Sequence, residues 1–264
     1  MSAINLEYFD THAHIHLPGY KLDADEVWLS AQAAGVTRML AVGCSLSDSQ
    51  GAVQFAAKYD GIWAAIGIHP HEAEDFLAAQ GAKEAFEALL KSAKNSKIVA
   101  IGEIGLDYYY QHSPKEKQVE LLKWQLQLAE TYNLPVIFHV RDAFADFWPI
   151  FDEFDIKRGL IHSFTGVPSD VDQILKRGLY VALNGIMTFT SQVDQLTAAK
   201  NIPLDKLVLE TDAPYLTPVP HRGKICKPEH VKLTAAFLAE LRREPLEQLA
   251  YQTTQNARAL FNVK

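Results

Sequence analysis

The hydrophobic and polar positions of this chain alternate between two patterns from one end to the other. Short runs rich in β-branched residues recur throughout, and longer amphipathic stretches separate them. The short runs predict strands buried on both faces, and the longer stretches predict helices that connect parallel strands. We expect eight strands, at residues 8–16, 38–44, 62–70, 98–105, 135–141, 159–164, 180–185 and 206–214.

Helices are predicted most clearly at residues 24–35, 83–94 and 113–133. The last of these opens with Ser113 as the expected N-cap and Pro114 at the first helical position. Eight strand–helix units in about 250 residues predict an α/β fold, a TIM-type (β/α)8 barrel. An open doubly wound sheet is the alternative, but no Gly-x-Gly-x-x-Gly follows the first strand and no P-loop sequence occurs.

Composition and charge narrow the class of protein. No low-complexity linker divides the chain, so we expect a single domain over residues 1–264. The opening MSAINLEYFD lacks the features of a signal peptide and no run approaches ~18 apolar residues, so we expect a cytoplasmic protein with no membrane partner. Cys44 and Cys226 match no metal-binding spacing and are expected to be free thiols. A net charge of -7 argues against a general polyanion binder, so any nucleic acid must be recognised locally.

The stretch FDTHAHIHL places three histidines, His12, His14 and His16, at every second position. On a strand their side chains would share one face and step by about 6.6 Å. Because a metal–nitrogen bond is only about 2.0–2.1 Å long, two neighbouring imidazoles can bind one ion but a third in line reaches it poorly. Other segments must complete any metal site.

Metal-competent side chains lie at or near the carboxyl ends of six predicted strands. In a barrel these strand ends face one mouth, where the active site is built. A single histidine at such a position favours a structural role, whereas convergence of the set favours a metal site. The set is His12, His14, His69, Glu103, His139, His162 and Asp212.

Six sequence blocks occur in order between residues 9 and 224: FDTHAHIH, AIGIHPH, AIGEIGLDYY, PVIFHVRDA, GLIHSFTG and LETDAPYLTPVPHRGK. Together they resemble the TatD family of metal-dependent deoxyribonucleases, within the amidohydrolase-like barrel group. DTHAH alone is only suggestive, because many barrel hydrolases begin with such a strand. Six blocks in this order are specific, and the resemblance covers nearly the whole chain.

The resemblance implies two divalent metal ions. It assigns His12, His14 and Asp212 to one ion, His139 and His162 to the second, and Glu103 as the bridge. Imidazole and carboxylate ligands suit Zn or Mn, and Mg is compatible where carboxylates and water dominate. Two such ions can activate a bridging water and clamp the attacking and leaving oxygens of a phosphodiester.

Three carboxylates of the candidate site can be given more specific roles. Glu103 is expected to be catalytic together with Asp212, and it stands where many related amidohydrolases carry a carboxylated lysine, which favours the nuclease branch. Asp10 either orients a ligand histidine through its other ring nitrogen or makes a plain structural hydrogen bond. Glu210, deeper in the barrel than Asp212, is expected to support a ligand or to pack.

Substrate contacts are expected from basic and aromatic side chains. Arg141 could bind phosphate through two hydrogen bonds or form a structural ion pair. The resemblance places His69 near the scissile phosphate, and His71 is a weaker candidate. In the loop HRGKICK, Arg222 and Lys224, with Lys227, are expected to grip a nucleic-acid backbone, although a solvated loop is the alternative.

Two sequence features leave the substrate open. Family members often continue the basic loop with Arg-Asn-Glu-Pro, whereas this chain has Ile225, Cys226, Lys227 and Pro228. The tyrosines at residues 108–110 could stack on unpaired bases or pack against the barrel rim, and none is assigned as catalytic.

The leading hypothesis is a two-metal phosphodiesterase whose partner is DNA, exonuclease-like on ends or single strands, with a metal-activated water as nucleophile. We expect a monomer or weak oligomer. The alternative is hydrolysis of a small cyclic amide, ester or phosphotriester on the same metals, because this barrel supports many chemistries. A third reading is a non-catalytic barrel that serves as a binding partner, which a missing ligand would favour.

Overall fold

A computed structural model of the chain describes residues 6–92 and 97–264. Each of the eight predicted strands is present, and most end earlier than their apolar pattern suggests. The strands are β1 Tyr8–Ala13, β2 Val36–Val42, β3 Ile62–Ile66, β4 Ile98–Asp107, β5 Val136–Arg141, β6 Gly159–Ile161, β7 Tyr180–Leu183 and β8 Leu207–Leu209.

Helices connect the strands, as the amphipathic stretches predict. They are α1 Ala24–Ala33, α2 Leu46–Ala56, α3 Ala73–Ala78, α4 Ala82–Lys91, α5 Lys115–Tyr132, α6 Phe144–Phe151, α7 Pro168–Lys176, α8 Val193–Asn201, α9 Val231–Arg242 and α10 Leu246–Phe261. Short 3₁₀ turns are η1 Pro70–Glu72, η3 Gly185–Thr188, η4 Leu204–Lys206 and η5 Pro228–His230. The three predicted helices correspond to α1, α4 and α5, and residues 93–94 of the second prediction lie outside the described residues.

The predicted N-cap of α5 is wrong. Pro114, with ψ of 144°, is the cap residue, and no side chain caps this helix. The hydroxyl of Ser113 instead donates to the carbonyl of His71 (2.7 Å) and accepts from the backbone N–H of Glu74 (3.1 Å). Ser113 therefore satisfies a free N–H in the first turn of α3, a long-range contact that the local pattern could not reveal.

The strands follow chain order, β1 to β8, in one eight-stranded sheet. The pairs β3–β4, β4–β5, β5–β6 and β7–β8 are parallel. After the end of β1, His14 N donates to Ala213 O (2.6 Å), and Asp212 N donates to His12 O (2.9 Å). These bonds join the first strand to the segment after the last one, so the predicted TIM-type barrel is confirmed and the open doubly wound sheet is excluded.

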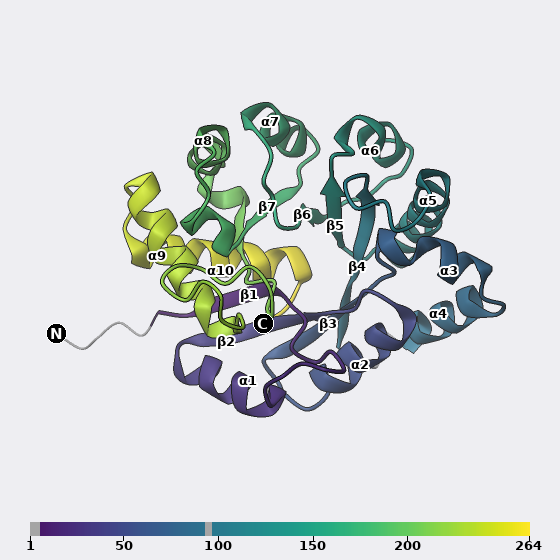
Figure 1. Ribbon diagram of the computed structural model, residues 1–264, viewed down its shortest axis with the longest axis horizontal. Coiled ribbons are helices and arrows are strands. Elements are labelled where there is room, and N and C mark those ends of the chain that lie inside the picture. The colour runs from purple at the N-terminus through teal and green to yellow at the C-terminus, as the bar shows by residue number, and fades with distance from the viewer. Residues whose placement is uncertain (1–5, 93–96) are drawn as a thin grey trace. The chain divides into compact units, whose positions relative to one another are not determined.

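The chain divides into two compact units. The terminal unit comprises the described residues up to Leu40 together with Ser163–Lys264, and the central unit comprises Ala41–His162. In the terminal unit α10 packs against β1, β8 and α9, and in the central unit α5 packs against β4 and α3 (Figure 1). The single-domain expectation stays a prediction. No helix within residues 6–92 and 97–264 is long and apolar enough to span a membrane.

Two buried glutamines on α5 fix the backbone of neighbouring segments in the central unit. The side-chain amide of Gln125 exchanges hydrogen bonds with the backbone of Ile68, at 2.8 and 3.0 Å. Gln118 does the same with the backbone of Asp107, also at 2.8 and 3.0 Å. Because buried backbone groups need partners, these amides hold the segments just before His69 and at the end of β4 in one conformation.

Candidate active site

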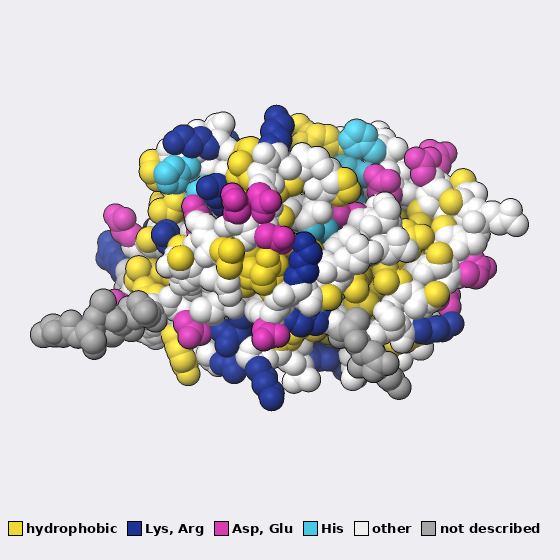
Figure 2. Space-filling model, turned by 90° about the horizontal axis from the view of Figure 1, so that it is seen from below, with side chains coloured by type: hydrophobic (Ala, Val, Ile, Leu, Met, Phe, Trp, Pro, Cys, Tyr) yellow, Lys and Arg dark blue, Asp and Glu magenta, His cyan; other side chains and the backbone are white. Residues whose placement is uncertain are grey.

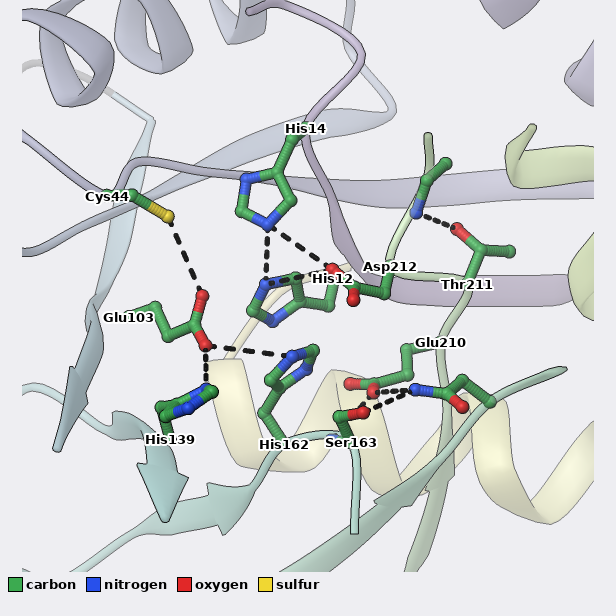
Figure 3. A network of polar contacts seen from close by, with 12 residues as sticks. His12, His14, Cys44, Glu103, His139, His162, Ser163, Glu210, Thr211 and Asp212 are labelled. Carbon is green, nitrogen blue, oxygen red and sulfur yellow. Dashed lines mark hydrogen bonds and ion pairs between the residues drawn. The ribbon is translucent and has the colours of Figure 1, made fainter. Parts of the chain in front are cut away.

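In the terminal unit, His12, His14 and Asp212 form one cluster (Figure 3). The Nε2 atoms of His12 and His14 lie 3.0 Å apart, and Asp212 Oδ1 lies 3.9 Å and 3.4 Å from them, respectively. Two nitrogens bound at 2.0–2.1 Å to one tetrahedral ion would be about 3.3 Å apart. The donor types and spacings of this cluster therefore fit one divalent ion.

Asp10 and Thr211 hold this cluster in place. Asp212 has a φ of 58°, in the left-handed region that aspartate tolerates better than most residues. Asp10 accepts hydrogen bonds from Thr211 N (2.8 Å), Thr211 Oγ1 (2.6 Å) and His12 N (3.3 Å). Burial raises the pKa of Asp10 to about 8. These contacts are to backbone and hydroxyl groups, which agrees with the structural alternative for Asp10.

Glu210 supports a neighbouring loop of the same unit. Its carboxylate is buried and lies beside Ser163 (Figure 3). It accepts from Ser163 N (2.8 Å) and from Asn184 Nδ2 (3.1 Å). Asn184 Nδ2 also donates to Ser163 Oγ (2.9 Å). The expected supporting role of Glu210 agrees with this network, since it fixes the turn where Ser163 has a φ of 46°.

In the central unit, the buried carboxylate of Glu103 is surrounded by imidazoles and one thiol (Figure 3). Glu103 Oε1 lies 2.7 Å from His139 Nδ1 and 3.7 Å from His162 Nε2. The thiol of Cys44 points at Glu103 Oε2, 3.6 Å away. A buried carboxylate is costly unless it is paired, and imidazoles with a divalent ion would neutralise this one.

His69 lies as close to the Glu103 carboxylate as His162 does. Its Nε2 atom is 3.7 Å from Glu103 Oε1, and the ligand atoms of His69, Glu103 and His139 lie within 4.8 Å of one another. Burial, followed by the neighbouring His139, holds the pKa of His69 well below its ordinary value. A neutral buried imidazole can bind a metal, so His69 can serve as a ligand as well as in the substrate-binding role that the family resemblance implies for it.

The sequence reading missed Asp107, which contacts the other side of His139. Asp107 Oδ2 lies 3.0 Å from His139 Nε2 and 2.9 Å from His71 Nε2. Burial lowers the pKa of His139, but its hydrogen bonds with Asp107 and Glu103 outweigh this and raise the pKa to about 8. A carboxylate at this place orients a ligand imidazole, and a metal would displace the proton that His139 carries. One signal was present: Asp107 follows Glu103 by four residues, on the same face of the strand.

Gly105 permits the close approach of β4 and β5 that brings Glu103 to His139. Its φ is 151°, and a Cβ on it would lie 1.8 Å from the carbonyl oxygen of His139. No side chain larger than hydrogen fits there without moving the backbone of β5.

We predict that Gly105→Ala lowers the free energy of unfolding by about 3 kcal/mol or more, because strain at a glycine-like φ adds to a backbone clash. Gly81→Ala is the matched control, since Gly81 also has a positive φ but its Cβ would meet nothing within 4 Å. The control should lose only about 1–2 kcal/mol. Urea unfolding followed by circular dichroism measures both, and equal losses would show that the contact with β5 is unimportant.

Arg141, at the end of β5, is exposed and lies against two tyrosines. Its guanidinium carbon is 4.2 Å from the ring centroid of Tyr109 and 4.7 Å from that of Tyr110. Within residues 6–92 and 97–264, Arg141 forms no salt bridge, so the structural ion pair considered for it is not found. Its binding of phosphate stays a prediction.

The basic loop of the terminal unit is partly engaged with its own fold. Arg222 is exposed, but it donates to Thr217 O (2.9 Å) and covers the ring of Phe189 at 3.7 Å. Lys224 is exposed, and its carbonyl accepts from the Thr217 hydroxyl (2.6 Å). On the face shown in Figure 2, Lys and Arg side chains are interspersed with Asp and Glu. Binding of DNA by Arg222 and Lys224 stays a prediction. Among the described residues, neither Cys44 nor Cys226 forms a disulfide.

His230 supports the end of this loop as a neutral imidazole. Its Nδ1 atom accepts from Lys227 N (3.2 Å), and its ring stacks on His221 with centroids 5.0 Å apart. Burial, followed by the neighbouring His221, lowers the pKa of His230 to about 4.

We predict that the protein loses stability as the pH falls from about 6.5, the ordinary pKa of histidine, towards 4. The sign follows because a depressed pKa in the folded state makes protonation favour the unfolded chain. NMR titration of the His230 ring should give a pKa about 2 units below that of a free histidine. His230→Asn keeps an acceptor for Lys227 N and should flatten this part of the pH–stability curve. A His230 pKa near 6.5 would contradict the prediction.

The sequence of this chain is similar to those of known metal-dependent hydrolases and nucleases. The family model "TatD related DNase" matches residues 9–262. The uncharacterized metal-dependent hydrolase YabD of Bacillus subtilis is 38% identical over 257 residues, which cover 97% of this chain and 99% of that protein. The 3'-5' ssDNA/RNA exonuclease TatD of Cronobacter sakazakii is 35% identical, with 96% of this chain and 97% of that protein covered.

A solved structure agrees with these matches. The crystal structure of YJJV, a TatD homolog from Escherichia coli K12, superposes with a TM-score of 0.91 at 30% identity and covers 99% of this chain and 100% of that one. The similarity therefore extends over almost the whole chain, in sequence and in fold.

Proposed function

Because this chain belongs to the TatD family of metal-dependent hydrolases, we propose that it is a divalent-metal-dependent phosphodiesterase that shortens DNA from its ends or in single strands. The observation that carries the proposal is the buried Glu103 carboxylate, which contacts His139 and lies 3.7 Å from both His69 and His162. Relatives named as exonucleases of single-stranded DNA and RNA favour a nucleic-acid substrate.

We assign His12, His14 and Asp212 to one divalent ion, and His139 and His162 to a second. Glu103 would hold the ion of the central unit together with His139 and His162. Bound at these residues, Zn, Mn or Mg would supply an activated water and stabilise charge on the phosphodiester oxygens. The donor sets of both units, nitrogen and oxygen atoms from imidazole and carboxylate, are of the type that such ions bind.

Other residues of the chain orient the proposed ligands and contact the substrate. Asp107 fixes the ring orientation of His139, and Gln118 fixes the backbone of Asp107 in turn. Arg141 lies two residues beyond His139 on the same strand, and its exposed guanidinium can donate two hydrogen bonds to a phosphate. Among the residues that the structure describes, Arg141 pairs with no carboxylate, which suits contact with an anionic substrate.

A metal-dependent nuclease assay tests the proposal. Protein freed of metal by dialysis is supplied with Mg, Mn or Zn and incubated with 5′-labelled single-stranded DNA, blunt duplex DNA and single-stranded RNA of the same sequence. Single-stranded DNA should be shortened only when a metal is present. No cleavage with any of the three metals would refute the proposal. Turnover of cyclic amides, esters or phosphotriesters by that same preparation would support the small-molecule alternative.

A further inference from the structure

We propose that Tyr109, Tyr110 and Arg141 form a stacking platform that binds an unpaired base of the substrate strand beside the cleaved phosphodiester. The inference rests on the proposed nuclease function and extends it, because it identifies a base-binding surface in the central unit.

The two tyrosines of the platform are each more than half exposed. Tyr109 is 58% exposed and Tyr110 is 51% exposed. Within residues 6–92 and 97–264, neither hydroxyl makes a hydrogen bond. Tyr108 contrasts with them, because its hydroxyl donates to Asp146 Oδ2 (3.0 Å) and Lys115 covers its ring at 3.9 Å. Tyr108 thus packs against its own fold, whereas Tyr109 and Tyr110 each keep more than half of their surface exposed.

The rings and the guanidinium are arranged as a surface for a flat ligand. Tyr109 and Tyr110 meet edge to face, with centroids 4.8 Å apart. Arg141 lies over both rings, and Tyr110 stacks on His112 at 5.9 Å with an interplanar angle of 17°. Aromatic rings bind any unpaired base through its π-face, and arginine adds a planar cation that can also contact phosphate. This composition matches single-stranded nucleic acid.

One carboxylate connects the platform to the candidate metal ligands of the same unit. Asp107 Oδ1 accepts from the backbone N–H groups of Tyr109 (2.9 Å) and Tyr110 (3.0 Å). Its other oxygen, Oδ2, contacts His139 and His71. The loop that carries the tyrosines is therefore held in a fixed position relative to His139. A base bound to the platform would lie at a fixed distance from a phosphate bound at the metal ligands.

Abasic substrates and tyrosine variants test the platform together. We compare kcat/KM on short single-stranded DNA that is intact or carries one abasic residue, moved stepwise along the strand from each end. The wild-type protein should lose about 5- to 100-fold when the abasic residue occupies the platform position. Tyr109→Ala/Tyr110→Ala should lose a comparable factor on intact DNA and should no longer distinguish intact from abasic strands. Tyr109→Phe/Tyr110→Phe, which keeps the rings, should behave like the wild type.

Tyr251→Ala is the matched control, because Tyr251 is 64% exposed on α10 of the other unit and should not affect discrimination. If the alanine double variant digests both substrates like the wild type, the platform is wrong and the nuclease proposal stands. If the wild type digests neither strand with any metal, the nuclease proposal fails and the platform with it.

Discussion

The Glu103→Gln variant is expected to digest single-stranded DNA at least about 100-fold more slowly than the wild-type protein. Glutamine keeps the size of the side chain but removes its charge. Glu103 Oε1 lies 2.7 Å from His139 and 3.7 Å from His69 and His162. The substitution therefore removes the negative charge that faces all three imidazoles. Both activity and metal content should fall. The measurements are kcat/KM and metal per chain by mass spectrometry.

A surface glutamate provides the control for this prediction. Glu120, on α5, is half-exposed and pairs with Lys117 at 3.0 Å, an exposed ion pair worth little to the fold. Glu120→Gln should keep wild-type activity and metal content. Circular dichroism establishes that both variants are folded. Full activity in folded Glu103→Gln would mean that the carboxylate is not part of the catalytic centre.

The second large effect is a difference between variants of His12 and His16, which lie in the same sequence run. His12→Ala should lose the metal of the terminal unit and at least about 100-fold in activity, because the buried His12 Nε2 atom lies 3.0 Å from that of His14. His16→Ala should keep its metal, because His16 lies three residues beyond the end of β1 and is only partly buried.

Metal content per chain, measured after purification without chelator, compares the two variants directly. His12→Asn is measured beside His12→Ala, since a smaller change of volume in a buried site protects the fold. If His16→Ala loses metal to the same extent as the His12 variants, the assignment of only two ligands to this run is wrong. If none of them loses metal, the ligand set of the terminal unit is wrong.

The sequence predicted the barrel well because buried parallel strands leave a strong pattern. Apolar runs such as those around Ile62 and Val136 are buried on both faces, and this shows without any knowledge of their neighbours. The strand ends were placed too late where functional residues follow. β1 stops at Ala13 and β8 at Leu209, since the chain turns there to place His14 and Asp212, the latter with a φ of 58°.

The sequence indicated which types of side chain gather at the candidate site, but it did not indicate most of the residues that support them. Histidines and carboxylates at strand ends are visible in a sequence, whereas partners distant in the chain are not. Asp107 with His71, and Gln125 with Ile68, pair across 36 and 57 residues, respectively. The proximity of His69 to Glu103 likewise arises from the packing of β3 beside β4. The ligand assignments, the cytoplasmic location and the oligomeric state stay predictions.

The central claim is that this protein hydrolyses the phosphodiester bonds of DNA with divalent metal. Digestion of single-stranded DNA in ¹⁸O-labelled water, with Mn restored to metal-free protein, tests it most directly when wild type and Glu103→Gln are compared by mass spectrometry. We predict that the wild type releases nucleotides with ¹⁸O in the phosphate, from the attacking water, and that Glu103→Gln releases almost none. Intact DNA with the wild type under Mn, Mg and Zn alike, or equal release by both proteins, would contradict the account.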